Sequence, residues 1–235
     1  MEKLVYVLWR GDRDAVDVPG QLHEVTAPAL IDAGARFVKM AVVDDSVARG
    51  EALRIGSQPV DKDAVISFWL EESFRRQELE AIVAAAADRV AGYLVTESRP
   101  LRTPPSHLHG AGERTDGFHL VTCIRRRGDL SHDDFIARWQ GPFRDTAIDG
   151  QNTWDYVRNE IVRPLTPDAP DWSAIIEEGF PIEALDDPAA FFGATTDADL
   201  AERQARMFET VQTFLDLTTV DSHPMSEFVF EAGPG

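Results

Sequence analysis

Histidine is the residue type in this chain best suited to proton transfer near neutral pH, because its imidazole titrates there. The six histidines are His23, His107, His109, His119, His132 and His223. His23 lies in a helix-like segment and His119 in a strand-like segment, so either side chain could face an enclosed pocket. Packing at a surface is the alternative role for His23, and a hydrogen-bonded place in the core is the alternative for His119.

Carboxylates are the second group of candidates. Glu160 ends a strand-like run, and a carboxylate in an apolar pocket has a raised pKa that suits general acid or base chemistry. The alternative for Glu160 is a salt bridge with Arg158 or Arg163. Glu177 and Glu178 also lie in a strand-like run, and we expect both to be solvated.

Metal and cofactor sites are not predicted by the motifs of the chain. The pair His107-x-His109 lies in a segment rich in proline and glycine, with no third ligand at a recognisable spacing. Catalytic zinc takes three protein ligands and structural zinc takes four. The chain also has no glycine-rich phosphate loop, nucleophile elbow or dinucleotide fingerprint. We therefore predict no functional metal and no cofactor.

Aromatic side chains could line a pocket for a small hydrophobic molecule, since such pockets are apolar with a few polar groups. A core role is the alternative for each of them. The candidates for substrate binding, which include one amide, are Tyr6, Trp9, Trp69, Trp139, Phe143, Tyr156 and Asn159.

The elements that must position these residues occur in a repeated order. Strand-like runs are expected at 3–10, 35–47, 64–71 and 90–97, with helices at 18–34 and from residue 74. This order is β-α-β-β-α-β, the ferredoxin-like arrangement. The same order begins again at residue 118 and ends with a strand at 225–231.

The two copies indicate a tandem duplication. Leu4 and Val5 match Leu120 and Val121, 116 positions later. We expect a first half at 1–98, a linker at 99–117 and a second half at 118–235. The first strand of each half is apolar on both faces, so each sheet needs helices on one side and the other sheet on the opposite side. The predicted fold class is α+β, with two antiparallel sheets face to face as a barrel within one chain.

The second half resembles the EthD family of dimeric α+β barrel proteins. The resemblance lies in the helix entered by Ser131, in Phe135-x-x-x-Trp139, and in the strand that begins at Tyr156. In the first half, the run from Lys3 and the turn at Ala27-Pro28 are similar to the family. The resemblance implies a cofactor-independent enzyme for an aromatic or polycyclic small molecule, with lyase, dehydratase or isomerase chemistry.

The chain departs from the EthD pattern where the family usually has histidine. Phe143 and Thr26 occupy the helix positions, and Glu160 occupies the strand position. His23 lies one helical turn from Thr26. The resemblance therefore implies that the proton-transfer residue of an enzyme would be His23, His119 or Glu160. The alternative is a non-catalytic binding or accessory protein that has lost the family histidines.

The composition of the chain disfavours some classes of binding partner. The formal net charge is −18, with 41 acidic residues against 23 lysines and arginines, and this charge disfavours nucleic acid and anionic membranes. Cys123 is the only cysteine, and no apolar run reaches the ~20 residues of a membrane helix. We expect a cytoplasmic protein that is a monomer with an internal pseudo-dimer, or a homodimer.

Overall fold

The computed structural model describes residues 1–11 and 17–231, and its first half has the predicted order of elements. A π-helical turn at Leu22–Thr26 joins the first two helices into one continuous helical segment. A 3₁₀ segment, Asp45–Leu53, follows the second strand. The elements are β1 (Glu2–Trp9), α1 (Val18–Gln21), α2 (Ala27–Asp32), β2 (Phe37–Val42), β3 (Ala64–Leu70), α3 (Gln77–Ala84) and β4 (Arg89–Leu101).

The second half repeats this order with longer helices. The Ser131 hydroxyl accepts a hydrogen bond from the Asp134 backbone N–H at 3.1 Å, which caps the first helix as predicted. Pro142 then starts a separate helix, because proline tolerates the first helical position. The elements are β5 (Phe118–Ile124), α4 (His132–Gln140), α5 (Pro142–Gly150), β6 (Asp155–Pro164), β7 (Ala174–Phe180), α6 (Pro188–Phe192), α7 (Asp197–Val211) and β8 (Asp221–Glu231).

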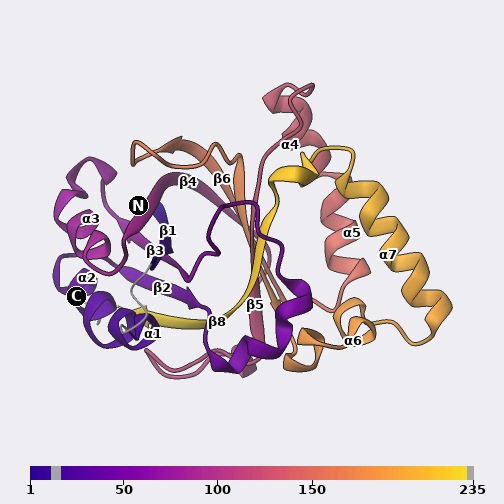
Figure 1. The fold of residues 1–235 in the computed structure, drawn as a ribbon, viewed down its shortest axis with the longest axis horizontal. Helices are drawn as coiled ribbons and strands as arrows, with labels where there is room; N and C mark the ends of the chain where they lie inside the picture. Colours follow the sequence, from indigo (N-terminus) through magenta and orange to yellow (C-terminus); the bar gives the residue numbers. More distant parts are fainter. Residues whose placement is uncertain (12–16, 232–235) are drawn as a thin grey trace.

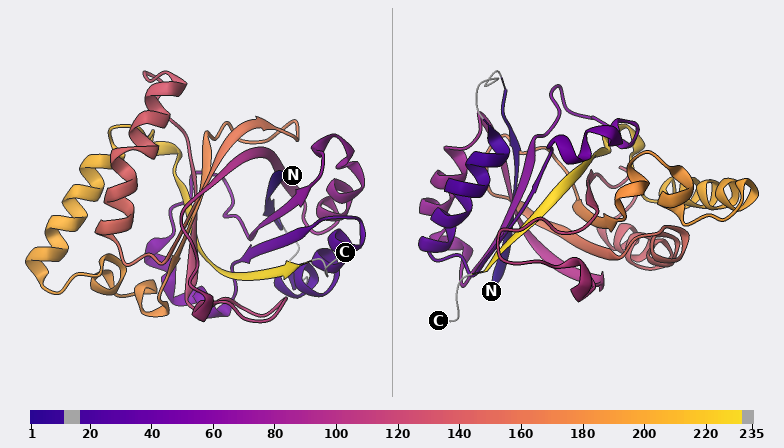
Figure 2. Two further views of the ribbon diagram at one scale, coloured as in Figure 1. Left: turned by 180° about the vertical axis from the view of Figure 1, so that it is seen from behind. Right: turned by 90° about the horizontal axis from the view of Figure 1, so that it is seen from below.

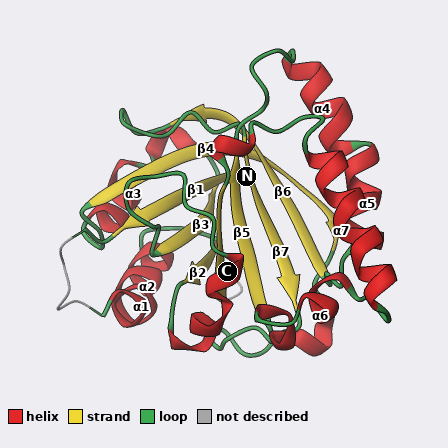
Figure 3. Ribbon diagram, turned by 45° about the vertical axis from the view of Figure 1, so that its right-hand side comes forward, coloured by secondary structure: helices red, strands yellow, loops and turns green. Residues whose placement is uncertain are grey.

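The eight strands form one closed antiparallel barrel in the order β1-β3-β2-β8-β5-β7-β6-β4 (Figures 1 and 3). Each half contributes four adjacent strands in the ferredoxin-like order. The halves join where β2 pairs with β8 and where β4 pairs with β6. The predicted pairing of two sheets within one chain is confirmed, and the hydrogen-bonded seams leave the barrel without open edges.

Strand alternation explains why the first strands are apolar throughout. Val5 and Val7 of β1 face the barrel interior, whereas Leu4 and Tyr6 lie in the core beneath the first-half helices. The helices of the two halves lie on opposite sides of the barrel (Figure 2). The first strand of each half is therefore covered on both faces, as the sequence predicted.

Some local predictions were wrong. A helix was expected from residue 74, but Phe74 lies in a 3₁₀ turn before α3 and is 79% exposed. The last strand was expected at 225–231, but β8 begins at Asp221 and buries His223. Strand β4 continues to Leu101, beyond the strand expected at 90–97. Every helix in the described ranges is too short or too polar to cross a bilayer.

Candidate functional site

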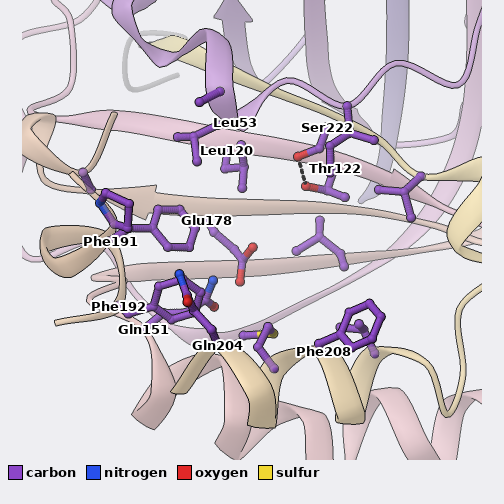
Figure 4. Close-up of a pocket in the computed structure, with 18 of the residues that line it drawn as sticks. Leu53, Leu120, Thr122, Gln151, Glu178, Phe191, Phe192, Gln204, Phe208 and Ser222 are labelled. Atoms are coloured by element: carbon purple, nitrogen blue, oxygen red, sulfur yellow. Dashed lines mark hydrogen bonds between the residues drawn. The ribbon is translucent and has the colours of Figure 1, made fainter. Parts of the chain in front are cut away.

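A cavity of about 610 Å³ lies between the outer face of the second-half sheet and helices α5, α6 and α7. Figure 4 shows the side chains that enclose it, with Leu53 contributed by the first half. Its volume is in the range of small-molecule sites. The lining is mainly apolar and includes Leu120, Ile176, Phe191, Met207, Phe208 and Phe214.

The cavity exists because α7 does not pack directly on the sheet. The helix carries apolar side chains at Leu200, Met207 and Val211, yet none of its residues is fully buried. Arg203 instead ties α7 to the neighbouring helices, donating to the backbone carbonyls of Asp149 and Phe192, each at 3.1 Å. The apolar face of α7 therefore covers an open space that a hydrophobic ligand would fill.

The equivalent space in the first half is filled by side chains. Leu22 and Leu30 from the first helical segment and Val83 from α3 belong to the same buried cluster as Tyr6 and Phe68. The two halves thus share a fold but differ in the space between sheet and helices. Side chains fill this space in the first half, whereas a cavity remains in the second half.

Glu178 is the acidic group at the centre of this cavity. Its side chain extends from β7 into the open space (Figure 4), its residue is only 7% exposed, and its Oε1 has no hydrogen-bond partner. Burial among apolar groups raises the pKa of Glu178 to about 8. The expectation that Glu178 is solvated was wrong, because α6 and α7 cover the outer face of its strand.

Polar groups that could orient a ligand surround Glu178. Gln151 and Gln204 line the same side of the cavity, and the Gln151 carbonyl oxygen is buried without a partner. On another wall, the Thr122 and Ser222 hydroxyls share a hydrogen bond of 2.8 Å (Figure 4). An apolar cavity with a few convergent polar groups and a perturbed carboxyl is the usual form of a small-molecule site.

A carboxyl group with a pKa near 8 can act in both directions of proton transfer. At pH 7 it is mostly protonated, so it can donate a proton or a hydrogen bond. Its ionised fraction is a stronger base than an ordinary glutamate. The site is therefore suited to general acid or general base chemistry on a hydrophobic molecule.

Comparisons with known proteins identify the fold. No protein-family profile matches the chain, and no curated protein sequence matches it. An anthrone oxidase-like protein of known structure has a TM-score of 0.55 and 14% identity, over 99% of this chain and 94% of that one. A presumed monooxygenase from Lactobacillus acidophilus NCFM has a TM-score of 0.52 and 11% identity, over 99% and 96%. The chain has the dimeric α+β barrel fold. At these identities the likeness concerns the fold alone.

Two of the predicted proton-transfer residues lie away from the cavity. His23 Nε2 is 2.6 Å from the Gly112 carbonyl oxygen, and its ring contacts Phe228 and Phe230 edge-on. Its surroundings are those of a packing residue.

Glu160 lies at the rim of the sheet. His132 Nε2 lies 2.9 Å from Glu160 Oε1, and the Gln140 amide donates to Oε2 at 3.3 Å. Neither arginine considered from the sequence is among these partners.

His119 faces the interior of the barrel, on the opposite side of β5 from the cavity. Only 1% of it is exposed, and its Nε2 lies 3.5 Å from Asp155 and 3.3 Å from Glu227. Neither contact has the alignment of a hydrogen bond. A proton-transfer role for His23, His119 or Glu160 stays a prediction, and their positions favour Glu178 for the cavity.

The predicted substrate-binding residues divide between several places. Phe143 lines the cavity, and Trp139 and Tyr156 belong to the hydrophobic core beside it. Burial raises the pKa of Tyr156. These three residues belong to one buried cluster, and of the three only Phe143 lines the open space.

The other four predicted substrate-binding residues lie elsewhere. Tyr6 stacks on Phe68 in the first-half core, with ring centroids 5.3 Å apart. Trp9 and Trp69 lie towards opposite ends of the barrel, where Trp9 stacks on a second tryptophan and Trp69 lies beside Lys3. The Asn159 amide donates to Glu177 Oε1 at 2.8 Å inside the barrel.

Sequence reasoning missed Glu178 although a signal was present. The strand 174–180 contains two adjacent glutamates between apolar residues. Successive residues of a strand point to opposite faces, so one glutamate had to face the barrel and the other the helices. Because both faces of such a strand are covered, neither side chain could be solvated.

Proposed function

We propose that the protein is a cofactor-independent enzyme that transfers a proton on a hydrophobic aromatic or polycyclic small molecule, with Glu178 as the catalytic acid and base. The observation that carries this proposal is one buried, unpartnered carboxyl group projecting into an apolar cavity of about 610 Å³. We also propose that the protein belongs to the EthD family and that its reaction is of the lyase, dehydratase or isomerase type.

The lining supports a flat aromatic substrate. Phe143, Phe191, Phe208 and Phe214 supply aromatic surface, and Gln151 and Gln204 supply amide groups beside Glu178. One structural neighbour is described as anthrone oxidase-like. Anthrone is a three-ring ketone whose CH₂ group lies between two aromatic rings, so loss of a proton gives a delocalised anion. This makes anthrone a rational probe of the cavity.

The proposed step begins with ionised Glu178. Its carboxylate removes a proton from the activated carbon, the C–H electron pair moves into the ring system, and negative charge develops on the substrate oxygen. Glu178 is then neutral and returns its proton to oxygen, to carbon or to a leaving group. Hydrogen-bond donors such as the Gln204 amide and the Ser222 hydroxyl could stabilise the developing charge.

The test is hydrogen exchange at the anthrone CH₂ group in D₂O under anaerobic conditions, followed by NMR. We expect the protein to accelerate exchange and Glu178→Gln to lower the rate by about 10²–10⁴-fold, the usual contribution of a general acid or base. Glu71→Gln is the matched control, because the Glu71 side chain is 70% exposed at the surface. Unchanged exchange in the folded Glu178→Gln variant would refute the assignment.

A non-catalytic binding protein is the second candidate. It is favoured by the residues that replace the family histidines, Thr26, Phe143 and Glu160, and by the ability of protonated Glu178 to donate a hydrogen bond to a ligand. The same experiment separates the two functions. Binding of anthrone, followed by fluorescence, without faster exchange than in protein-free buffer would support the binding protein and contradict the enzyme.

A further inference from the structure

A second cluster of functional groups lies inside the barrel, on the far side of the sheet from the cavity. His119 of β5, Asp155 of β6 and Glu227 of β8 are 1%, 0% and 3% exposed. His119 Nε2 is 3.3 Å from Glu227 Oε2 and 3.5 Å from Asp155 Oδ2. These three atoms all lie within 4.8 Å of one another. Three chain segments far apart in sequence thus direct one ligand atom each to a common point.

The remaining oxygen of each carboxylate is held by a neighbour. Asp155 Oδ1 accepts a hydrogen bond from the Thr103 backbone N–H at 3.1 Å, and Glu227 Oε1 accepts one from the Thr115 hydroxyl at 3.1 Å. Among the described residues, His119 Nε2 and Asp155 Oδ2 make no hydrogen bond, whereas Glu227 Oε2 faces the Lys39 ammonium at 3.0 Å. Metal sites likewise hold their carboxylate ligands through outer groups. His119 Nδ1 has no such partner in the described part of the chain.

The two distances from His119 Nε2, 3.3 Å to Glu227 and 3.5 Å to Asp155, match metal coordination. Zinc binds histidine nitrogen at roughly 2.0–2.1 Å and carboxylate oxygen at roughly 2.0–2.2 Å. Two ligands at corners of a tetrahedron are then roughly 3.3–3.5 Å apart. We propose that His119, Asp155 and Glu227 form a binding site for a divalent transition-metal ion, with one coordination position left open.

The charges of the barrel interior favour a cation between His119, Asp155 and Glu227. The ionic groups around His119 are Lys3, Lys39, Arg99, Glu97, Glu177, Asp155 and Glu227. Among these groups the carboxylates outnumber the cationic side chains by one. A metal ion engages both carboxylates and the imidazole together.

Lys39 is the competing cation. Its Nζ lies 3.0 Å from Glu227 Oε2 and 2.5 Å from Glu177 Oε2. Because Lys39 keeps Glu177 as a partner, it can give up Glu227 to a metal ion without becoming an unpaired buried charge. The metal ion would then bind Glu227, while the Lys39 ammonium would stay paired with Glu177.

The site has a path to solvent. A cavity of about 440 Å³ at the barrel mouth is lined by Lys39, Arg99, Thr103 and Glu227, among others. It lies on the barrel side of the sheet, whereas Glu178 faces the helices. The proposed metal site is therefore independent of the proposed proton-transfer site. It also opposes the sequence-based expectation of no functional metal, which considered only ligands near one another along the chain.

The test uses the full-length, tag-free protein after treatment with a chelator. Calorimetric titration with Zn²⁺ should give one ion per chain, and His119→Ala and Asp155→Asn should each abolish this binding. Thr115→Val removes only the hydroxyl that holds Glu227, and it should weaken binding by about 10–100-fold. The double variant His107→Ala/His109→Ala removes the half-buried His107 and the exposed His109, and it should bind Zn²⁺ as the unaltered protein does.

X-ray absorption of the zinc-loaded protein provides a readout that does not depend on folding of the variants. It should show nitrogen and oxygen ligands at about 2.0–2.2 Å and no sulfur. The proposal fails if the folded protein takes up no stoichiometric zinc. It also fails if uptake survives Asp155→Asn in a folded protein, or if it disappears in the His107→Ala/His109→Ala variant.

Discussion

Replacing Glu178 with glutamine should raise the free energy of unfolding above that of the unaltered protein, and this difference should grow as the pH rises. Glutamine has nearly the shape of glutamate but cannot ionise, so the folded protein no longer has to hold a charge in an apolar cavity. The pKa of Glu178 is about 8 in the folded protein, against an ordinary value of 4.5. The effect can be measured without knowing the substrate.

The sign and size follow from proton linkage. Below pH 4.5 the carboxyl group is protonated in both the folded and the unfolded protein, so its titration does not affect the free energy of unfolding. Between pH 4.5 and 8 the unfolded protein loses this proton while the folded protein keeps it, and stability falls by up to about 1.4 kcal/mol per pH unit. Above pH 8 the difference reaches a plateau of roughly 4–5 kcal/mol when the cavity is dry.

The assay is urea unfolding followed by tryptophan fluorescence at intervals from pH 5 to pH 9. The stability of Glu178→Gln minus that of the unaltered protein should increase steadily over this range and level off above pH 8. Glu71→Gln controls for the loss of one negative charge from an acidic protein. A stability difference that stays constant with pH would show that Glu178 titrates as a solvated carboxyl group, and the reasoning about the cavity would be wrong.

Two further predictions concern the other acidic residues and the histidines. Glu177→Gln should destabilise the protein at pH 7 by about 3–5 kcal/mol, because Lys3 and Lys39 lose a buried partner, and urea unfolding measures this. His23→Ala and Glu160→Gln should keep most of the anthrone exchange activity, since neither residue lines the cavity. A 10²-fold loss in either variant would return the catalytic role to the residue predicted from the EthD resemblance.

The fold could be predicted because its causes are local and repeated. The runs around Leu4 and Leu120 carry apolar residues on both faces of the strand, which requires cover on both faces. The copy of the same pattern 116 positions later supplied the second sheet. The closed barrel follows from these two facts, since four-stranded halves that pair at both edges leave no edge strand exposed.

The functional site was harder to predict because it depends on where helices lie, which periodicity does not specify. The apolar stripe of α7 predicts a helix with one buried face, but not that Arg203 ties this helix to α5 and α6 while a cavity stays open beneath it. The barrel cluster shows the same limit. His119, Asp155 and Glu227 become neighbours only through the strand order β8-β5-β7-β6.

Two adjacent residues show how one strand serves two different environments. Glu177 faces the barrel, where burial alone would raise the pKa, but Lys3 and Lys39 hold the pKa well below its usual range. Glu178 faces the cavity, where no positive charge of the described residues offsets burial, and its pKa rises to about 8. A glutamate side chain is therefore held as an anion on one face of β7, at Glu177, and titrates near pH 8 on the other face, at Glu178. Because the closed barrel separates the two faces, charges that stabilise the interior cannot neutralise the carboxyl group in the cavity.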